Sequence, residues 1–73
     1  MSLQLENLKF LIESAGNDQN KIGQLYIRFL DDLECLQYLI LTYGTNYSYS
    51  NFPPLYYAIV YDQESSVQAL LMG

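Results

Sequence analysis

The apolar positions near the start of the chain recur at the spacing of an α-helix and predict a first helix over residues 3–15. Ser2 is suited to cap its N-terminus. Gly16 stands where a helix commonly ends in a left-handed residue. The apolar residues that share one side of this helix are Leu5, Leu8, Leu11 and Ile12.

A longer apolar pattern runs from Ile22 to Tyr43 and allows two interpretations. Its spacings of three and four residues fit one continuous helix, and they fit two short helices separated at Asp31 and Asp32 equally well. Aspartate is a good N-cap but a mediocre interior residue, because its carboxylate competes for backbone N–H groups. The paired aspartates therefore favour the break. The apolar positions of the pattern are Ile22, Leu25, Phe29, Leu33, Leu36, Ile40 and Tyr43.

Residues 44–51 have the composition of a loop, in which residues 47–52 are expected to form at most an extended stub. Pro53 and Pro54 then open another segment, since proline is tolerated in the first turn of a helix. Two short helices are predicted there, with capping residues at 62–65 between them. Their apolar positions are Leu55, Ala58, Ile59, Val67, Leu70 and Leu71. The complete pattern predicts an all-α fold of short antiparallel helices.

One phrase recurs along the chain. Residues 5–12 and 33–40 align at an offset of 28 without a gap, and each copy is followed by a glycine, Gly16 or Gly44. A weaker copy at residues 65–71 precedes Gly73. Self-similarity at this period is typical of repeat proteins, in which each unit buries its apolar face against its neighbours.

These phrases resemble those of the ankyrin-repeat family. In that family the first helix of a unit opens with a Thr-Pro-Leu-His-x-Ala phrase, and the second ends in Val-x-x-Leu-Leu-x-x-Gly. Residues 53–58 resemble the first phrase, with Tyr56 at the histidine position, and residues 67–71 resemble the second. In the middle unit residues 36–44 match the second phrase, whereas the first is matched only in part and Arg28 stands where alanine is expected.

The resemblance implies a fold of stacked, short antiparallel helix pairs that form one domain over residues 1–73. Its units are a partial repeat with the second helix only at 3–16, a degenerate repeat at 21–44 and a repeat at 52–73. The alternative that the apolar spacing leaves open is a three-helix bundle with one long central helix.

Composition narrows the classes of partner. The net charge is −5, from three basic and eight acidic residues. Nucleic acids and anionic membranes are bound by clustered lysine and arginine, so we expect neither as a partner. No run of about 20 apolar residues predicts a membrane span, and no secretory signal is evident. We expect a cytoplasmic protein, or one in the host cytoplasm if its source is a virus or an intracellular bacterium.

The residues on which most catalytic sites depend are scarce. The chain has no histidine and one cysteine, Cys35, so the usual zinc sites and histidine-dependent catalysis cannot be assembled from it. Cys35 is expected to be a passive thiol, and its equivalent in the first unit, Asn7, suggests that this position need not be buried. The acidic residues near the predicted turns are expected to cap helices. They are Asp31, Asp32, Glu34, Asp62 and Glu64. We therefore expect no enzyme, metal or cofactor.

Tyrosine is unusually frequent, at eight of 73 residues. Aromatic side chains with a polar group are enriched in protein interfaces. In ankyrin repeats the loop and the inner face of the first helix contact the partner. The resemblance therefore implies partner contacts by Tyr47, Tyr49, Phe52 and Tyr57. The alternative is that some of these aromatic side chains fill the core or the space between repeats. Arg28 is added as the basic candidate, which either pairs with a neighbouring aspartate or projects to the partner, whereas Tyr56 is expected to have a structural role.

The resulting functional hypothesis is a non-catalytic module that binds a protein partner as an adaptor, decoy or inhibitor. The alternative is a small helical structural protein that forms a homodimer through exposed apolar surface.

Overall fold

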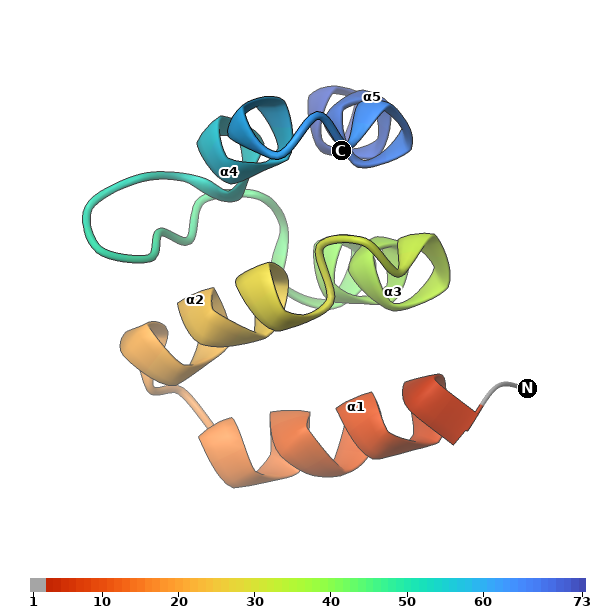
Figure 1. Ribbon diagram of the computed structural model, residues 1–73. Coiled ribbons are helices and arrows are strands. Elements are labelled where there is room, and N and C mark those ends of the chain that lie inside the picture. The colour runs from red at the N-terminus through yellow and green to blue at the C-terminus, as the bar shows by residue number, and fades with distance from the viewer. Residues whose placement is uncertain (1–2) are drawn as a thin grey trace.

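The computed structural model describes residues 3–73, which contain five α-helices (Figure 1). The helices are α1 (Leu3–Ala15), α2 (Gln19–Arg28), α3 (Leu33–Tyr43), α4 (Pro54–Val60) and α5 (Glu64–Met72). The predicted all-α class is confirmed, and α1 has the predicted bounds. Ser2, the predicted N-cap of α1, lies outside the described residues.

The chain breaks between α2 and α3, as the paired aspartates indicated. Asp32 has an extended backbone conformation, and its carboxylate accepts a hydrogen bond from the backbone N–H of Cys35 at 3.2 Å. It is thus the N-cap of α3, while Asp31 lies exposed in the turn. The alternative with one long central helix is wrong, because an N-cap carboxylate occupies the backbone donor that a continuous helix would use internally.

The helices form three levels (Figure 1). The first level is α1, the second contains α2 and α3, and the third contains α4 and α5. α1 contacts both helices of the second level, α2 contacts α4, and α3 contacts α5. The loop between α3 and α4 extends past the N-terminal end of α2 (Figure 1).

The core lies between these levels. Its largest fully buried side chain is Tyr26, whose hydroxyl donates to the carbonyl of Leu39 at 3.1 Å and to that of Gly44. The buried hydroxyl of Ser66 on α5 donates to the carbonyl of Leu30, in the turn between α2 and α3. Each of these bonds joins segments that are distant in the sequence. Among the described residues, every buried side-chain nitrogen and oxygen has a hydrogen-bond partner.

Candidate functional site

Residues 49–52 form a tight hairpin turn in the loop before α4. The N–H of Tyr49 donates to the carbonyl of Phe52 at 2.8 Å, and the N–H of Phe52 donates back at 3.1 Å. Between them Ser50 and Asn51 have φ angles of 52° and 73°, as a type I′ turn requires. The turn reverses the chain so that Tyr49 and Phe52 stand side by side. The expected extended stub is therefore a closed two-residue hairpin.

An aromatic surface, which we define as Tyr49, Phe52, Tyr56, Tyr57 and Tyr61, covers this hairpin and α4. The Phe52 and Tyr56 rings stack with centroids 4.4 Å apart, and the Tyr49 and Tyr57 rings meet edge to face at 5.9 Å. Tyr61 stacks on Tyr57 at 6.3 Å. The hydroxyl of Tyr57 also donates to the carbonyl of Tyr49 at 2.7 Å, which fastens the hairpin to α4.

The aromatic surface is both exposed and ordered. Tyr61 is 58% exposed, and Tyr49, Phe52 and Tyr56 are 38–45% exposed. Each of these rings nevertheless contacts another ring, so part of its rotational freedom is already lost before any partner binds. A surface of this kind offers apolar contact area at a reduced entropic cost.

The structure brings together three of the five predicted site residues, Tyr49, Phe52 and Tyr57. Tyr56, for which a structural role was expected, is exposed and belongs to the same surface. Tyr61 was missed by the sequence analysis. Its signal was the spacing of four residues from Tyr57, which places two side chains on one side of a helix.

Tyr47, which was predicted to contact the partner, packs against the core. Its half-buried ring stacks on Tyr26 with centroids 6.0 Å apart and meets Tyr43 edge to face at 5.5 Å. These contacts hold the loop against the core, so Tyr47 anchors the segment that carries the aromatic surface.

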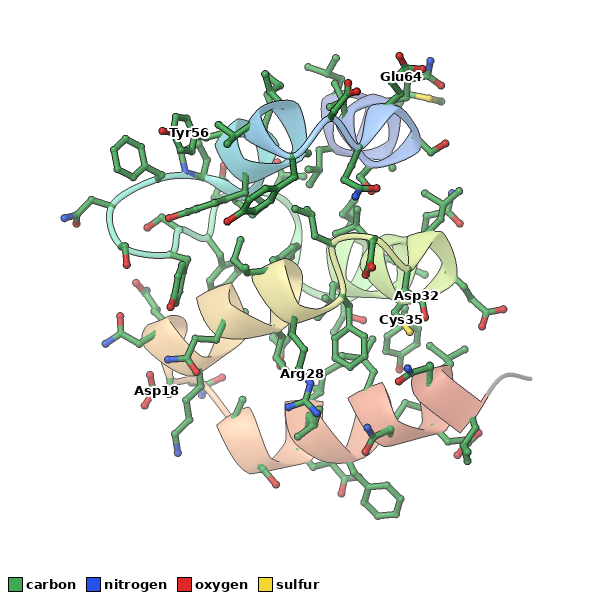
Figure 2. The ribbon with its side chains drawn as sticks, viewed as in Figure 1. Asp18, Arg28, Asp32, Cys35, Tyr56 and Glu64 are labelled. Atoms are coloured by element: carbon green, nitrogen blue, oxygen red, sulfur yellow. The ribbon has the colours of Figure 1, made fainter. Side chains whose placement is uncertain are left out.

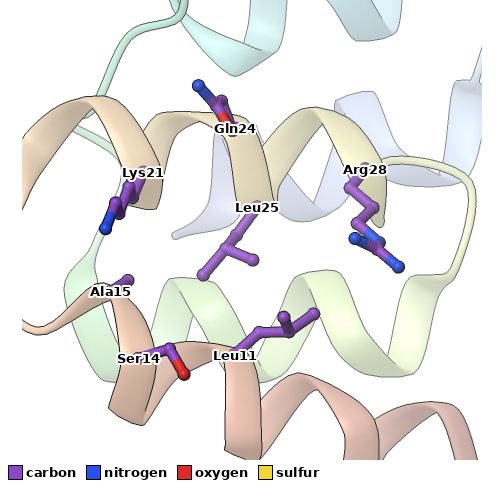
Figure 3. Close-up of a pocket in the computed structure, with 7 residues that line it drawn as sticks. All are labelled: Leu11, Ser14, Ala15, Lys21, Gln24, Leu25 and Arg28. Atoms are coloured by element: carbon purple, nitrogen blue, oxygen red, sulfur yellow. The ribbon is translucent and has the colours of Figure 1, made fainter.

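Arg28 borders the edge of the aromatic surface, where it lines a hollow together with Tyr61. It is at the last position of α2 and points toward α1, whereas Tyr56 lies on the third level (Figure 2). Arg28 also lines a second hollow, between α1 and α2 (Figure 3). Its guanidinium carbon is 5.8 Å from the centroid of the Phe29 ring, within the range of a cation–π contact. The other residues that line this second hollow are Leu11, Ser14, Ala15, Lys21, Gln24 and Leu25.

Arg28 was expected at the alanine position of the first ankyrin phrase, but the C-terminal ends of α2 and α4 give a different alignment. Tyr26 and Ala58 are both fully buried, and each lies three residues before the C-cap of its helix, Phe29 or Tyr61. Tyr26 therefore occupies the place of Ala58, and Arg28 does not. The turn after α2 is one residue longer than the turn after α4, which shifts the two units relative to each other.

Cys35 is fully buried, although its equivalent Asn7 is exposed. The difference arises because α1 covers the side of α3 on which Cys35 lies, as Figure 2 shows. Burial, together with the interactions of the thiol with Asp32, raises the pKa of Cys35 from 9.0 to about 11. A high thiol pKa disfavours the reactive thiolate. This environment supports the passive role expected for Cys35.

We expect the protein to lose stability as the pH rises above about 9, because buried groups keep their protons only in the folded state. Burial, with smaller effects of Tyr47 and Tyr43, raises the pKa of Tyr26 well above its usual value of 10.0. The pKa of Cys35 is raised as well. Because both pKa values are higher in the folded state, the stabilisation is complete below the unfolded pKa values and is lost as the unfolded chain ionises.

Urea unfolding followed by circular dichroism at pH 7 to 11 tests this expectation. The midpoint should remain level near neutrality and then fall, and in a Cys35→Ala variant the fall should begin about one pH unit later, near the tyrosine pKa. A midpoint that is unchanged or higher at pH 11 would contradict the prediction.

Within residues 3–73, no three histidine, cysteine, aspartate or glutamate side chains gather as a group that could hold a metal ion. No helix in this part of the chain is long and apolar enough to cross a membrane. The most distinctive feature of the described surface is thus the ordered aromatic surface. The sequence matches no family model, and searches of curated proteins and of solved structures gave no match.

Proposed function

We propose that this chain is a non-catalytic protein-binding module of ankyrin-repeat type, acting as an adaptor, decoy or inhibitor. The order of the helices supports the assignment to this family. The three recurring phrases fall on α1, α3 and α5, and α3 contacts both of the others. α2 and α4, which precede α3 and α5, contact each other in a second row.

The ordered aromatic surface is the observation that carries the proposed function. Binding-energy hot spots in protein interfaces are enriched in large aromatic side chains. Here Tyr49 and Phe52 present their rings on the hairpin, and Tyr56 and Tyr61 present theirs on α4 and its C-cap. Tyr57 bonds the hairpin to α4. The net charge of −5 favours a partner whose surface is basic around the contact, since opposite charges speed the encounter. The partner would dock on the hairpin and on the adjoining side of α4.

A double variant, Phe52→Ser with Tyr56→Ser, tests the site. Both rings are exposed, so we expect helicity to be retained while the affinity for the partner falls at least about 30-fold, as expected for two hot-spot residues. The partner would first be captured with the tagged wild-type chain, and its affinity would then be measured by isothermal titration calorimetry.

Leu41→Ser is the matched control, because Leu41 is an exposed apolar residue on α3 and lies outside the aromatic surface. It should bind as the wild type does. If the double variant is folded and keeps the wild-type affinity, the site is assigned wrongly.

A further inference from the structure

The outer side of α1 carries an apolar residue at a position that is covered inside the stack. Phe10 is 70% exposed, and its equivalent 28 residues later, Tyr38, is half-buried. α1 approaches Tyr38 closely, since the ammonium of Lys9 lies 5.5 Å from the centroid of its ring. Asn7 and its equivalent on α3, Cys35, differ in exposure in the same way, since Asn7 is exposed and Cys35 is buried. The outer side of α1 therefore corresponds to the side of α3 that contacts α1, and no helix within residues 3–73 covers it.

The other end of the stack also carries an exposed apolar residue whose equivalent on α3 is covered. The N-caps of α3 and α5 are Asp32 and Gln63, 31 residues apart, so Leu71 has the position of Ile40. Ile40 is half-buried and borders the hollow between α3 and α5, whereas Leu71 is 67% exposed. The exposed side of α5 thus corresponds to the side of α3 that contacts α5.

We propose that a second copy of this chain covers these ends head to tail, with α1 of one copy seated on α5 and α4 of the next. The contact would extend an existing series, in which α1 contacts α3 and α3 contacts α5. Because the two surfaces differ, the contact is heterologous, and copies can add at either end without closing into a dimer.

The size and charge of the surfaces predict weak association. α1 has 13 residues and is about 20 Å long, so it covers less than the roughly 1,600 Å² of a standard interface. Both surfaces are acidic, since Glu6 lies beside Phe10, and Asp62 and Glu64 border the outer side of α4 and α5. Salt screens this repulsion, so association should strengthen as the ionic strength rises.

Two single variants test the geometry by complementation. Phe10→Asp blocks the α1 surface, and Leu71→Asp blocks the α5 surface. In sedimentation velocity between about 10 µM and 1 mM, the mean mass of the wild type should rise with concentration and exceed that of a dimer. Each variant alone should be monomeric, because every contact needs both surfaces. An equimolar mixture should form a one-to-one dimer and nothing larger, since one intact surface remains on each variant.

Circular dichroism verifies folding, and Leu3→Asp and Ile59→Asp, at exposed positions of the same two ends, replace any variant that fails to fold. Leu41→Asp is the control and should associate as the wild type does, because Leu41 is 84% exposed on the middle level. A wild type that stays monomeric overturns the proposal. So does a mixture that fails to assemble, or a Leu71→Asp variant that still dimerises, which would indicate an α1 to α1 contact. Phe10 and Leu71 lie outside the aromatic surface, so a loss of self-association in these two variants is distinguishable from a loss of partner binding.

Discussion

Replacing Tyr26 with alanine should lower the free energy of unfolding by about 3–5 kcal/mol, the cost typical of removing a buried aromatic ring. The ring is fully buried and stacks on Tyr47, so its removal leaves a cavity between the levels and detaches the loop. A domain of 73 residues is expected to have a stability near the low end of about 5–15 kcal/mol. We therefore expect the variant to be largely unfolded at 37 °C, as measured by urea unfolding and circular dichroism.

The conservative variant Tyr26→Phe separates the ring from the hydroxyl. It keeps the packing but removes the hydrogen bonds to the carbonyls of Leu39 and Gly44, and should cost about 1–2 kcal/mol. Tyr57→Phe is the matched control, because it removes a hydrogen bond at the surface that water can replace, and should cost less than about 1 kcal/mol. Equal losses in the two variants would show that the buried hydroxyl has no special role.

Replacing Gly23 with alanine should lower the free energy of unfolding by about 2–3 kcal/mol, near the upper range for overpacking. Gly23 is buried in α2, and a Cβ atom there would overlap the backbone carbonyl of Ser48. The loop would have to move away from α2. This cost should exceed the gain of about 1 kcal/mol that alanine normally brings to a helix interior.

Gln24→Ala is the control for this prediction. Gln24 is the next residue of α2 and is exposed, so the variant should be neutral or slightly more stable. Because Tyr49 follows Ser48, Gly23→Ala should also weaken partner binding while Gln24→Ala does not. A Gly23→Ala variant as stable as the wild type would mean that the loop does not rest on α2.

Much of the helical framework could be predicted because its signals are local. Spacings of three and four residues indicated the helices, and the two aspartates indicated the break before α3. Gly16 and Gly44 have the positive φ angles, 56° and 85°, that their positions after helices predicted. Each of these features depends on residues within about one turn of helix, which a single sequence contains.

The rest depends on contacts between distant segments. The importance of Gly23 arises from Ser48, 25 residues later, and nothing near Gly23 in the sequence indicates that contact. Tyr26 was absent from the predicted apolar set, and its burial depends on the carbonyls of Leu39 and Gly44, which lie 13 and 18 residues later. The hairpin was missed because Ser50-Asn51 lacks the glycine that usually marks a type I′ turn.

The aromatic surface was only partly predictable for a similar reason. Sequence clustering brought Tyr47, Tyr49 and Phe52 together, but it could not distinguish the ring that faces the core from those that face solvent. The hairpin made that distinction, because it reverses the chain after Tyr49 and leaves Tyr47 behind against Tyr26. Arg28 was placed by a partial match of residues 25–28 to the first ankyrin phrase, whereas the C-terminal ends of α2 and α4 put Tyr26 at the position of Ala58.

The uneven distribution of the core has a consequence for the order of assembly. Most of the buried apolar side chains belong to α1, α2, α3 and the turns between them, whereas α4 and α5 have seven and nine residues and contribute few. Helices this short are unstable alone in water. During synthesis on the ribosome the first two levels can therefore condense on their own, and they then provide the template on which the last two helices form.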